Sequence, residues 1–89
     1  MKHLFIINPA AGKRRSTKKL EEDIRALDEP YEIAFTERAG DARRIARAAA
    51  ESGEQVRLYA CGGDGTLNEV VNGAAGYANA AVTNVPIGT

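Results

Sequence analysis

The fold is decided at residues 60–69, which read Ala-Cys-Gly-Gly-Asp-Gly-Thr-Leu-Asn-Glu. In front of the glycines, Val56, Leu58 and Ala60 form an alternating apolar pattern that is typical of a strand. Behind them, apolar residues recur from Leu67 onward at the three- and four-residue spacing of a helix. The sequence therefore predicts a strand, a glycine-rich turn and a helix in direct succession.

Three glycines surround one carboxylate, Asp64, in this turn. Glycine can adopt a positive φ and lets backbone N–H groups come close to a ligand. Thr66 and Glu69 have the spacing of a capping box, so the helix is expected to begin at Thr66. Its unpaired N–H groups and positive dipole end would then face the turn, which favours a bound phosphate. A turn whose glycines serve only packing is the alternative.

Residues 62–73, GGDGTLNEVVNG, resemble the signature of the diacylglycerol kinase catalytic domain. That family includes bacterial lipid kinases and the sphingosine and ceramide kinases, with NAD kinase and phosphofructokinase as more distant relatives. Asn8, Pro9 and Gly12 form an N-P-x-x-G sequence that is similar to the family's first nucleotide loop. The resemblance implies an enzyme that uses ATP and Mg²⁺ to phosphorylate a lipid hydroxyl, with diacylglycerol as the expected acceptor.

The predicted nucleotide site combines this resemblance with the glycine turns. Thr36 matches a position where family members contact the nucleotide, and Gly88-Thr89 ends a P-x-G-T turn like theirs. The expected cofactor-binding residues are Asn8, Pro9, Gly12, Lys13, Thr36, Gly62, Gly63, Asp64, Gly65, Thr66, Asn68, Glu69, Gly88 and Thr89. The part that Glu69 plays stays open, because a capping role already accounts for it.

Asp64 is the expected catalytic and metal-binding residue, since it is the only acid inside a glycine loop. Phosphoryl transfer needs positioned phosphates, a divalent cation and a group that accepts the nucleophile's proton. The resemblance implies two roles for Asp64. Its counterpart in sphingosine kinases is taken as the proton acceptor, whereas bacterial diacylglycerol kinases draw a base from their second domain. Organisation of Mg²⁺ and phosphate is therefore expected first, and proton acceptance second.

Basic residues are concentrated after the first loop, at Lys13, Arg14, Arg15, Lys18 and Lys19. Attraction of phosphates and a solvated helix start are equally open for Lys13 and Arg14, while solvation is preferred for Lys18 and Lys19. A P-loop is excluded, because no glycine stands five positions before Gly12 and Arg14 replaces the required Ser or Thr.

Strand and helix patterns alternate along the whole chain. Strands are expected at 4–7, 31–35, 56–61 and 81–85, and helices from Ser16 or Thr17 to before Pro30, over 42–53 and over 66–76. Right-handed crossovers then give an α/β fold, a three-layer α/β/α arrangement with a four-stranded parallel sheet. The expected strand order is 2-1-3-4, because that order brings the loops after the first, third and fourth strands together at a switch point. Residues 31–36 lie at its edge, and the loops after Asn8, Thr36, Cys61 and Ile87 share its carboxyl edge.

Length and charge exclude several classes of function. The chain has 89 residues with 12 basic and 12 acidic side chains, so we expect one domain and no capture of nucleic acid. No stretch approaches the ~20 apolar residues of a membrane span. The single cysteine, Cys61, fits a reducing cytoplasm and is expected to be a small buried residue rather than a nucleophile.

Residues 1–89 are expected to be the N-terminal nucleotide-binding part of a two-domain lipid kinase whose second, β-rich domain is absent from this chain. The lipid would bind through that domain, and the isolated chain would be inactive. Self-association, and peripheral contact of the full-length parent with the inner membrane surface, stay open. The alternatives are an NAD kinase-like or sphingoid-base kinase and a non-catalytic, flavodoxin-like binding domain. The residues at 67–73 and the Asn8-Pro9 loop favour the lipid kinases.

Overall fold

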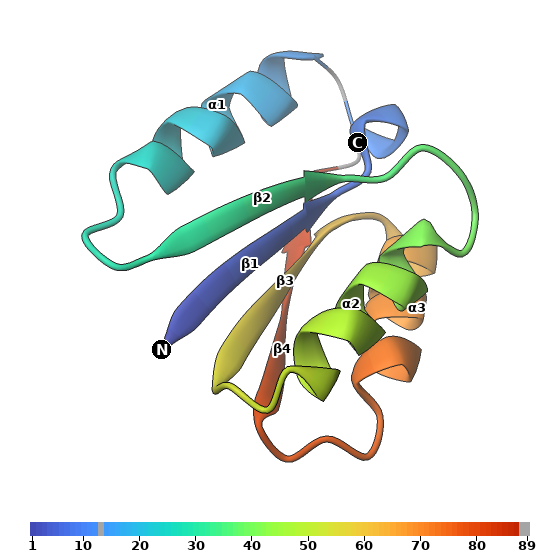
Figure 1. Ribbon diagram of the computed structural model, residues 1–89. Coiled ribbons are helices and arrows are strands. Elements are labelled where there is room, and N and C mark those ends of the chain that lie inside the picture. Colours follow the sequence, from blue (N-terminus) through green and yellow to red (C-terminus); the bar gives the residue numbers. More distant parts are fainter. Residues whose placement is uncertain (13, 88–89) are drawn as a thin grey trace.

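One parallel sheet, with its strands in the order β2-β1-β3-β4, organises the computed structural model, which describes residues 1–12 and 14–87. Figure 1 shows the four strands running side by side in the same direction. They span Lys2–Ile7 (β1), Tyr31–Phe35 (β2), Val56–Gly62 (β3) and Ala80–Pro86 (β4). The predicted strand order and the edge position of β2 are confirmed.

Three α-helices cover the two faces of the sheet. They span Arg14–Arg25 (α1), Asp41–Glu51 (α2) and Asp64–Ala74 (α3), and a short 3₁₀ turn, η1, covers Pro9–Ala11. Helix α1 lies on one face, and α2 and α3 lie together on the other (Figure 1). The three-layer α/β/α arrangement is thus confirmed. Within the described residues, no helix combines the length and the apolar character needed to cross a membrane.

The core has one layer on each side of the sheet, because the central strands bury both of their faces. The layer between the sheet and the helices α2 and α3 consists of Leu4, Ile6, Ala42, Ala46, Val56, Leu58, Ala60, Val70 and Ala74. The layer between the sheet and α1 consists of Phe5, Ile7, Ile24, Cys61 and Ile87. Alternate residues of β1 and β3 therefore serve opposite layers and hold the carboxyl ends of these strands rigidly in place.

The helix ends differ from the sequence prediction at α1. The helix begins at Arg14, before both candidate caps, and ends at Arg25, well ahead of Pro30. Leu27 consequently lies beyond the helix, where it is 38% exposed. Propensity places helix ends only within a few residues, since tertiary contacts decide where the last turn frays.

The edge strand β2 is only partly covered. Ile33 packs under α1, whereas Phe35, on the same face two residues later, is 47% exposed. Thr36, the next residue, is buried, and its backbone N–H donates to the carbonyl of Ile7 at 2.9 Å. Pairing with β1 thus continues for one residue past the strand and brings Thr36 to the carboxyl edge of the sheet.

On the α1 face of the sheet, His3 and Tyr59 join the central strands β1 and β3. The Tyr59 hydroxyl lies 2.7 Å from His3 Nδ1, and the Tyr59 ring stacks on Phe5 with 4.1 Å between centroids. Burial raises the pKa of the Tyr59 phenol. His3 Nε2 is 3.2 Å from the carboxylate of Glu29 but is not aligned for a hydrogen bond. This cluster links the two central strands to the layer under α1 and supports the fold.

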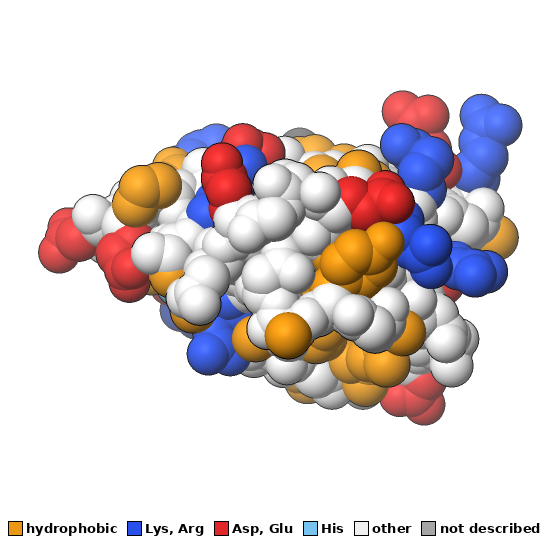
Figure 2. All heavy atoms as spheres, turned by 60° about the horizontal axis from the view of Figure 1, so that its bottom comes forward, with side chains coloured by type: hydrophobic (Ala, Val, Ile, Leu, Met, Phe, Trp, Pro, Cys, Tyr) orange, Lys and Arg blue, Asp and Glu red, His pale blue; other side chains and the backbone are white. Residues whose placement is uncertain are grey.

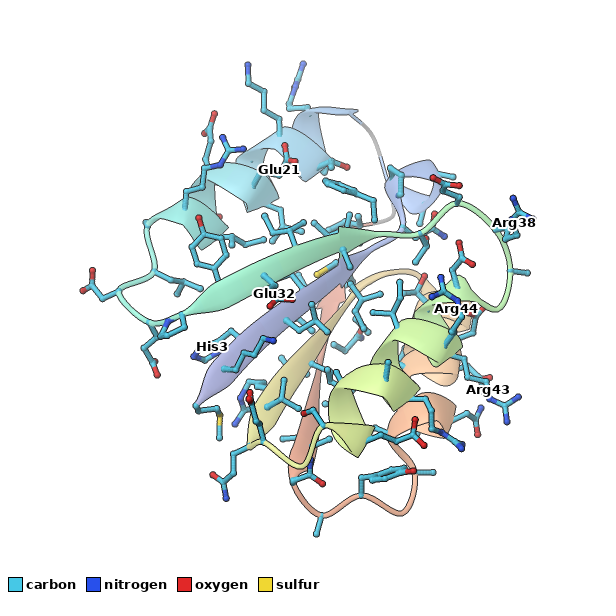
Figure 3. All side chains as sticks on the ribbon, viewed as in Figure 1. His3, Glu21, Glu32, Arg38, Arg43 and Arg44 are labelled. Atoms are coloured by element: carbon cyan, nitrogen blue, oxygen red, sulfur yellow. The ribbon has the colours of Figure 1, made fainter. Side chains whose placement is uncertain are left out.

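On the face shown in Figure 2, acidic and basic side chains are interspersed around apolar ones. Figure 3 shows Arg38, Arg43 and Arg44 directed outward from the loop before α2 and from the helix itself. Arg44 is balanced by Asp41, with 3.6 Å between Arg44 Nη2 and Asp41 Oδ1. The mixture of signs agrees with the net charge of zero that the sequence gives.

Candidate functional site

Main-chain hydrogen bonds bring the loops after β1, β3 and β4 together. The N–H of Asn8 donates to the carbonyl of Cys61 at 2.9 Å. The N–H of Ile87 donates to the carbonyl of Gly62 at 3.3 Å. Each bond extends strand pairing by one residue, so the three loops leave the sheet side by side at its carboxyl edge. This is the place where open parallel sheets bind ligands.

The first loop is a compact turn that packs against the end of β4. Asn8 Oδ1 accepts the N–H of Ala10 at 3.1 Å, and Pro9 stands at the first position of η1. A Cβ placed on Gly12 would lie 2.5 Å from the carbonyl oxygen of Ile87. Only glycine permits this approach, so Gly12 has a packing role whether or not a ligand binds.

Helix α3 begins at Asp64, two residues before the predicted start at Thr66. Gly63 is the N-cap with an extended backbone, φ −102° and ψ −162°. Thr66 lies inside the first turn, where it is buried against Gly62. The predicted start at Thr66 was wrong. It assumed that Thr66 and Glu69 form a capping box, but in the structure the Glu69 carboxylate accepts hydrogen bonds from Gly40 and Arg43 instead.

The three glycines of this turn differ in whether packing requires them. A Cβ on Gly62 would meet Thr66 Oγ1 and lie 2.8 Å from Thr66 Cβ, so packing requires glycine there. A Cβ on Gly63 or Gly65 would meet no atom within 4 Å, and neither residue has a positive φ. Their missing side chains instead leave the first turn of α3 open, where its N–H groups have no partner within the helix.

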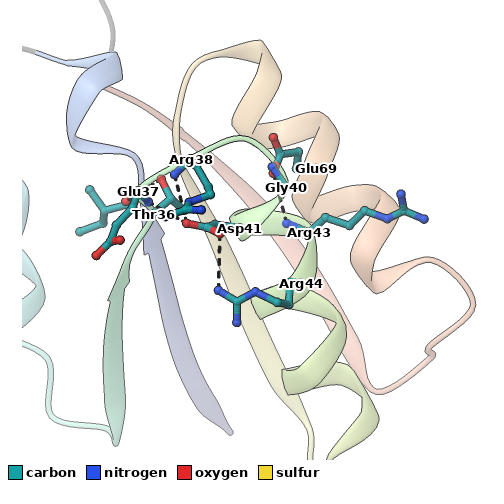
Figure 4. Close-up of polar contacts among 9 residues, drawn as sticks. Thr36, Glu37, Arg38, Gly40, Asp41, Arg43, Arg44 and Glu69 are labelled. Atoms are coloured by element: carbon teal, nitrogen blue, oxygen red, sulfur yellow. Dashed lines mark hydrogen bonds and ion pairs between the residues drawn. The ribbon is translucent and has the colours of Figure 1, made fainter.

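The carboxylate of Glu69 caps the neighbouring helix. Glu69 Oε1 accepts the N–H of Gly40 at 3.1 Å and lies 3.4 Å from the N–H of Arg43, which also donates to it (Figure 4). These groups belong to the N-terminus of α2, whose N-cap, Gly40, has a φ of 93°. A residue of α3 therefore supplies the acceptor that the start of α2 lacks.

Asp41 holds the loop in front of α2. It is the first residue of the helix, whose N-cap is Gly40. Its Oδ2 accepts the N–H of Glu37 at 2.8 Å and that of Arg38 at 3.1 Å (Figure 4). The bond from Glu37, then the one from Arg38, lowers the pKa of the Asp41 carboxyl below its ordinary value. The loop after β2 is thus closed onto the helix that follows it.

A cavity of about 330 Å³ opens between this loop and the first turns of α3. Its lining residues are Asn8, Ala10, Thr36, Glu37, Arg38, Ala39, Ala42, Gly65, Thr66 and Glu69. Among the predicted site residues, Asn8, Thr36, Gly65, Thr66 and Glu69 meet in this cavity. Gly62, Gly63, Asp64, Pro9 and Gly12 lie in the adjoining turns. Lys13, Gly88 and Thr89 fall outside the described residues.

Asn68 is placed differently from the other predicted residues. It is exposed on α3, where Asn72 Nδ2 donates to its carbonyl at 2.9 Å and to its Oδ1 at 3.0 Å. The side chain is therefore held along the helix and does not line the cavity. Five lining residues were not predicted, Ala10, Glu37, Arg38, Ala39 and Ala42. The sequence signal for such residues was only that the loops after the strands were expected at the carboxyl edge of the sheet.

Comparison with known proteins agrees with this architecture. A model of the diacylglycerol kinase catalytic domain family matches residues 2–89. The chain belongs to this family. It is 44% identical over 89 residues to a diacylglycerol kinase of Staphylococcus epidermidis, covering 96% of this chain and 28% of the relative. Diacylglycerol kinase from Staphylococcus aureus strain MRSA252 is 42% identical, with the same coverage.

A solved structure from Bacillus anthracis, provisionally described as a diacylglycerol kinase, aligns with a TM-score of 0.80. The identity is 29%, and the alignment covers 99% of this chain and 33% of the other. The chain therefore spans about a third or less of the length of the family members that it matches. The predicted family and fold are confirmed.

Within this diacylglycerol kinase family chain, Asp64 is the acid nearest the open turn of α3. Among residues 1–12 and 14–87, no group of three or more His, Cys, Asp or Glu side chains is arranged to hold a metal ion. Mg²⁺ is commonly bound through one or two carboxylates together with substrate phosphates and water. Asp64, at the first position of α3, has a side chain of the kind that such a site uses.

Proposed function

We propose that this chain is the ATP-binding portion of a lipid kinase that transfers the γ-phosphate of ATP to a lipid hydroxyl, with diacylglycerol as the acceptor. The observation that carries the proposal is the open first turn of α3, where Gly63 and Gly65 lack side chains that the fold itself would tolerate. Membership of the diacylglycerol kinase family and the names of the relatives support it.

The shape of the site suggests how ATP is held. The cavity offers methyl groups from Ala39 and Ala42 and polar groups from Asn8 and Thr36, a combination suited to a nucleoside. The phosphates then extend to the N-terminus of α3, where N–H groups without a partner inside the helix and the helix dipole favour negative charge. The predicted contacts of Lys13, Gly88 and Thr89 remain part of this proposal.

Asp64 orients the transferring phosphoryl group in the proposed reaction. Mg²⁺, when bound, neutralises the charge that develops on the β- and γ-phosphates. Asp64 sits at the first position of α3, so its carboxylate can ligate the cation while the backbone beside it binds phosphate. Acceptance of the lipid hydroxyl proton falls to Asp64 or to a group of the second domain, which also binds the lipid and contacts the membrane surface.

The test is an Asp64→Asn variant of the full-length protein that contains this chain. Asparagine keeps the size of the side chain and removes the charge, so turnover should fall by about 10²-fold or more. The melting temperature should stay within about 2 °C, since Asn suits the same backbone as Asp. Turnover close to that of the wild type would remove Asp64 from the chemistry.

The acceptor is identified with the wild-type full-length protein and radiolabelled ATP. Diacylglycerol should be phosphorylated in preference to sphingosine, ceramide and NAD. The isolated 89-residue chain should bind adenine nucleotide weakly and phosphorylate none of them. Preferential phosphorylation of sphingosine or NAD would replace the proposed acceptor, and robust turnover by the isolated chain would refute the proposed role of the second domain.

A further inference from the structure

The loop between β2 and α2 forms one wall of the candidate nucleotide cavity. Glu37, Arg38 and Ala39 line the cavity from this loop, and Gly65 and Thr66 line it from α3. The loop belongs to no strand or helix, and it turns into α2 through the left-handed backbone conformation of Gly40. Its shape therefore depends on the side chains that accept hydrogen bonds from its backbone N–H groups.

Two carboxylates, those of Asp41 and Glu69, accept four backbone N–H groups of this segment. Asp41 belongs to the segment itself and closes the loop locally. Glu69 belongs to α3 and reaches across to Gly40 and Arg43. Side-chain acceptors at a helix N-terminus stabilise it by satisfying donors that the helix cannot pair.

Glu69 connects the two walls of the cavity, because it lies on α3 and its carboxylate accepts hydrogen bonds from Gly40 and Arg43 at the start of α2. It lies about one helical turn beyond Gly65 and Thr66 on α3, so its reach to α2 fixes the spacing between that turn and the loop. Nearer the other end of α3, Gly73 packs against the carbonyl of Arg43 and leaves no room for a Cβ. The helix pair is thus joined near Gly73 by packing and by the hydrogen bond that Arg47 Nε donates to the Gly73 carbonyl at 3.2 Å, and near the cavity by the Glu69 carboxylate.

We propose that Glu69 is a positioning residue, which sets the width of the nucleotide cavity by capping α2 from α3. This inference rests on the proposed function, because it gives the cavity an adenine nucleotide as its ligand. Glu69 then acts on ATP affinity through residues 37–43, and its carboxylate stays on the backbone when nucleotide binds. Capping of α2 replaces the capping of its own helix that the sequence suggested.

The test compares Glu69→Gln and Glu69→Ala with Glu22→Gln in the full-length protein. Glu22 lies exposed on α1, so its variant is a matched control for the loss of one negative charge. Hydrogen exchange of the Gly40 and Arg43 amides is measured without nucleotide. In Glu69→Ala, exchange of these amides should be about tenfold faster, the size expected for a lost cap. In Glu69→Gln the increase should be smaller, because an amide oxygen can still accept both bonds.

Nucleotide affinity and kinetics are measured on the same variants. The Kd and KM for ATP should rise about tenfold in Glu69→Ala, less in Glu69→Gln and not in Glu22→Gln, while kcat changes by less than about threefold. Exchange of the β1 amides must stay slow, which shows that the Ala variant is folded. If that variant is unfolded, the Gln variant decides by the same two readouts.

Three results would overturn the inference. Faster exchange at Gly40 and Arg43 with unchanged ATP affinity would show that the cap is purely structural. A loss of kcat with unchanged exchange and KM would make Glu69 a catalytic residue. A wild-type protein that binds no adenine nucleotide would overturn the proposed function itself, and that outcome is separate from the first two because it is seen before any substitution.

Discussion

Gly62 at the end of β3 lies directly under the side chain of Thr66, so that a Cβ on Gly62 would come 2.8 Å from Thr66 Cβ. Thr66 is buried, and its branched side chain has little freedom to turn away. The first glycine of the turn is therefore a packing residue. Gly63 and Gly65, which have open space around them, are the two whose small size serves a ligand.

This difference predicts opposite effects for two similar substitutions. Gly62→Ala should destabilise the protein by about 1–3 kcal/mol, as overpacking of a tight contact usually does. Gly65→Ala should keep or raise stability by up to ~1 kcal/mol, because alanine favours the helical conformation. It should nevertheless weaken ATP binding by placing a methyl group where phosphate approaches. Urea unfolding and nucleotide titration measure both. Unchanged ATP affinity in Gly65→Ala would leave that glycine without a role in the site.

Gly73→Ala should separate α2 from α3. Its Cβ would meet the Arg43 carbonyl and lie 2.9 Å from Ala46 Cβ, and the backbone of a packed helix cannot easily move away. We expect a loss of about 1–3 kcal/mol in the free energy of unfolding despite the gain in helix propensity. Val71→Ala, at a half-exposed position of the same helix, is the control and should change stability by less than about 1 kcal/mol. Equal effects of the two variants would contradict the prediction.

Asp41 should make the loop before α2 sensitive to acid. Because its pKa is lowered from 3.8 in the folded protein, the carboxylate stabilises the fold above that pH and loses this contribution as the pH falls through the lowered pKa. NMR titration of the Asp41 carboxyl carbon should give a midpoint below 3.8. Protection of the Glu37 and Arg38 amides, measured against the intrinsic exchange rate at each pH, should fall only under those acidic conditions. A midpoint at or above 3.8 would exclude the hydrogen bonds to Oδ2 in solution.

Cys61 should be unreactive in the folded protein. The side chain is fully buried, and burial raises the pKa of its thiol from 9.0 to about 12. The raised pKa alone reduces the thiolate fraction at pH 8 by about a thousandfold, and burial blocks the reagent as well. Labelling with a thiol reagent should therefore be slow in buffer and fast in urea. Rapid labelling of the native protein would show that the end of β3 opens.

The strand order and the place of the site were accessible from the sequence for a physical reason. The alternation of strand and helix patterns predicted a parallel sheet. The order β2-β1-β3-β4 followed from the need to bring the loops after β1, β3 and β4 together at a switch point. The glycine turn after β3 marked the carboxyl edge, and Asn8 and Thr36 were expected at that edge and lie there. These inferences use local patterns and a general rule of chain topology, which one sequence carries.

Only the tertiary structure decided which partner each of these residues has. The spacing of Thr66 and Glu69 predicted that Glu69 caps its own helix, whereas the folded chain brings it to Gly40, the N-cap of α2. The sequence grouped three glycines together, whereas the side chain of Thr66 separates Gly62 from the other two. Contacts between distant segments depend on how two helices lie on one sheet. Local sequence determines that each helix forms, but the packing of α2 against α3 determines which carboxylate meets which backbone.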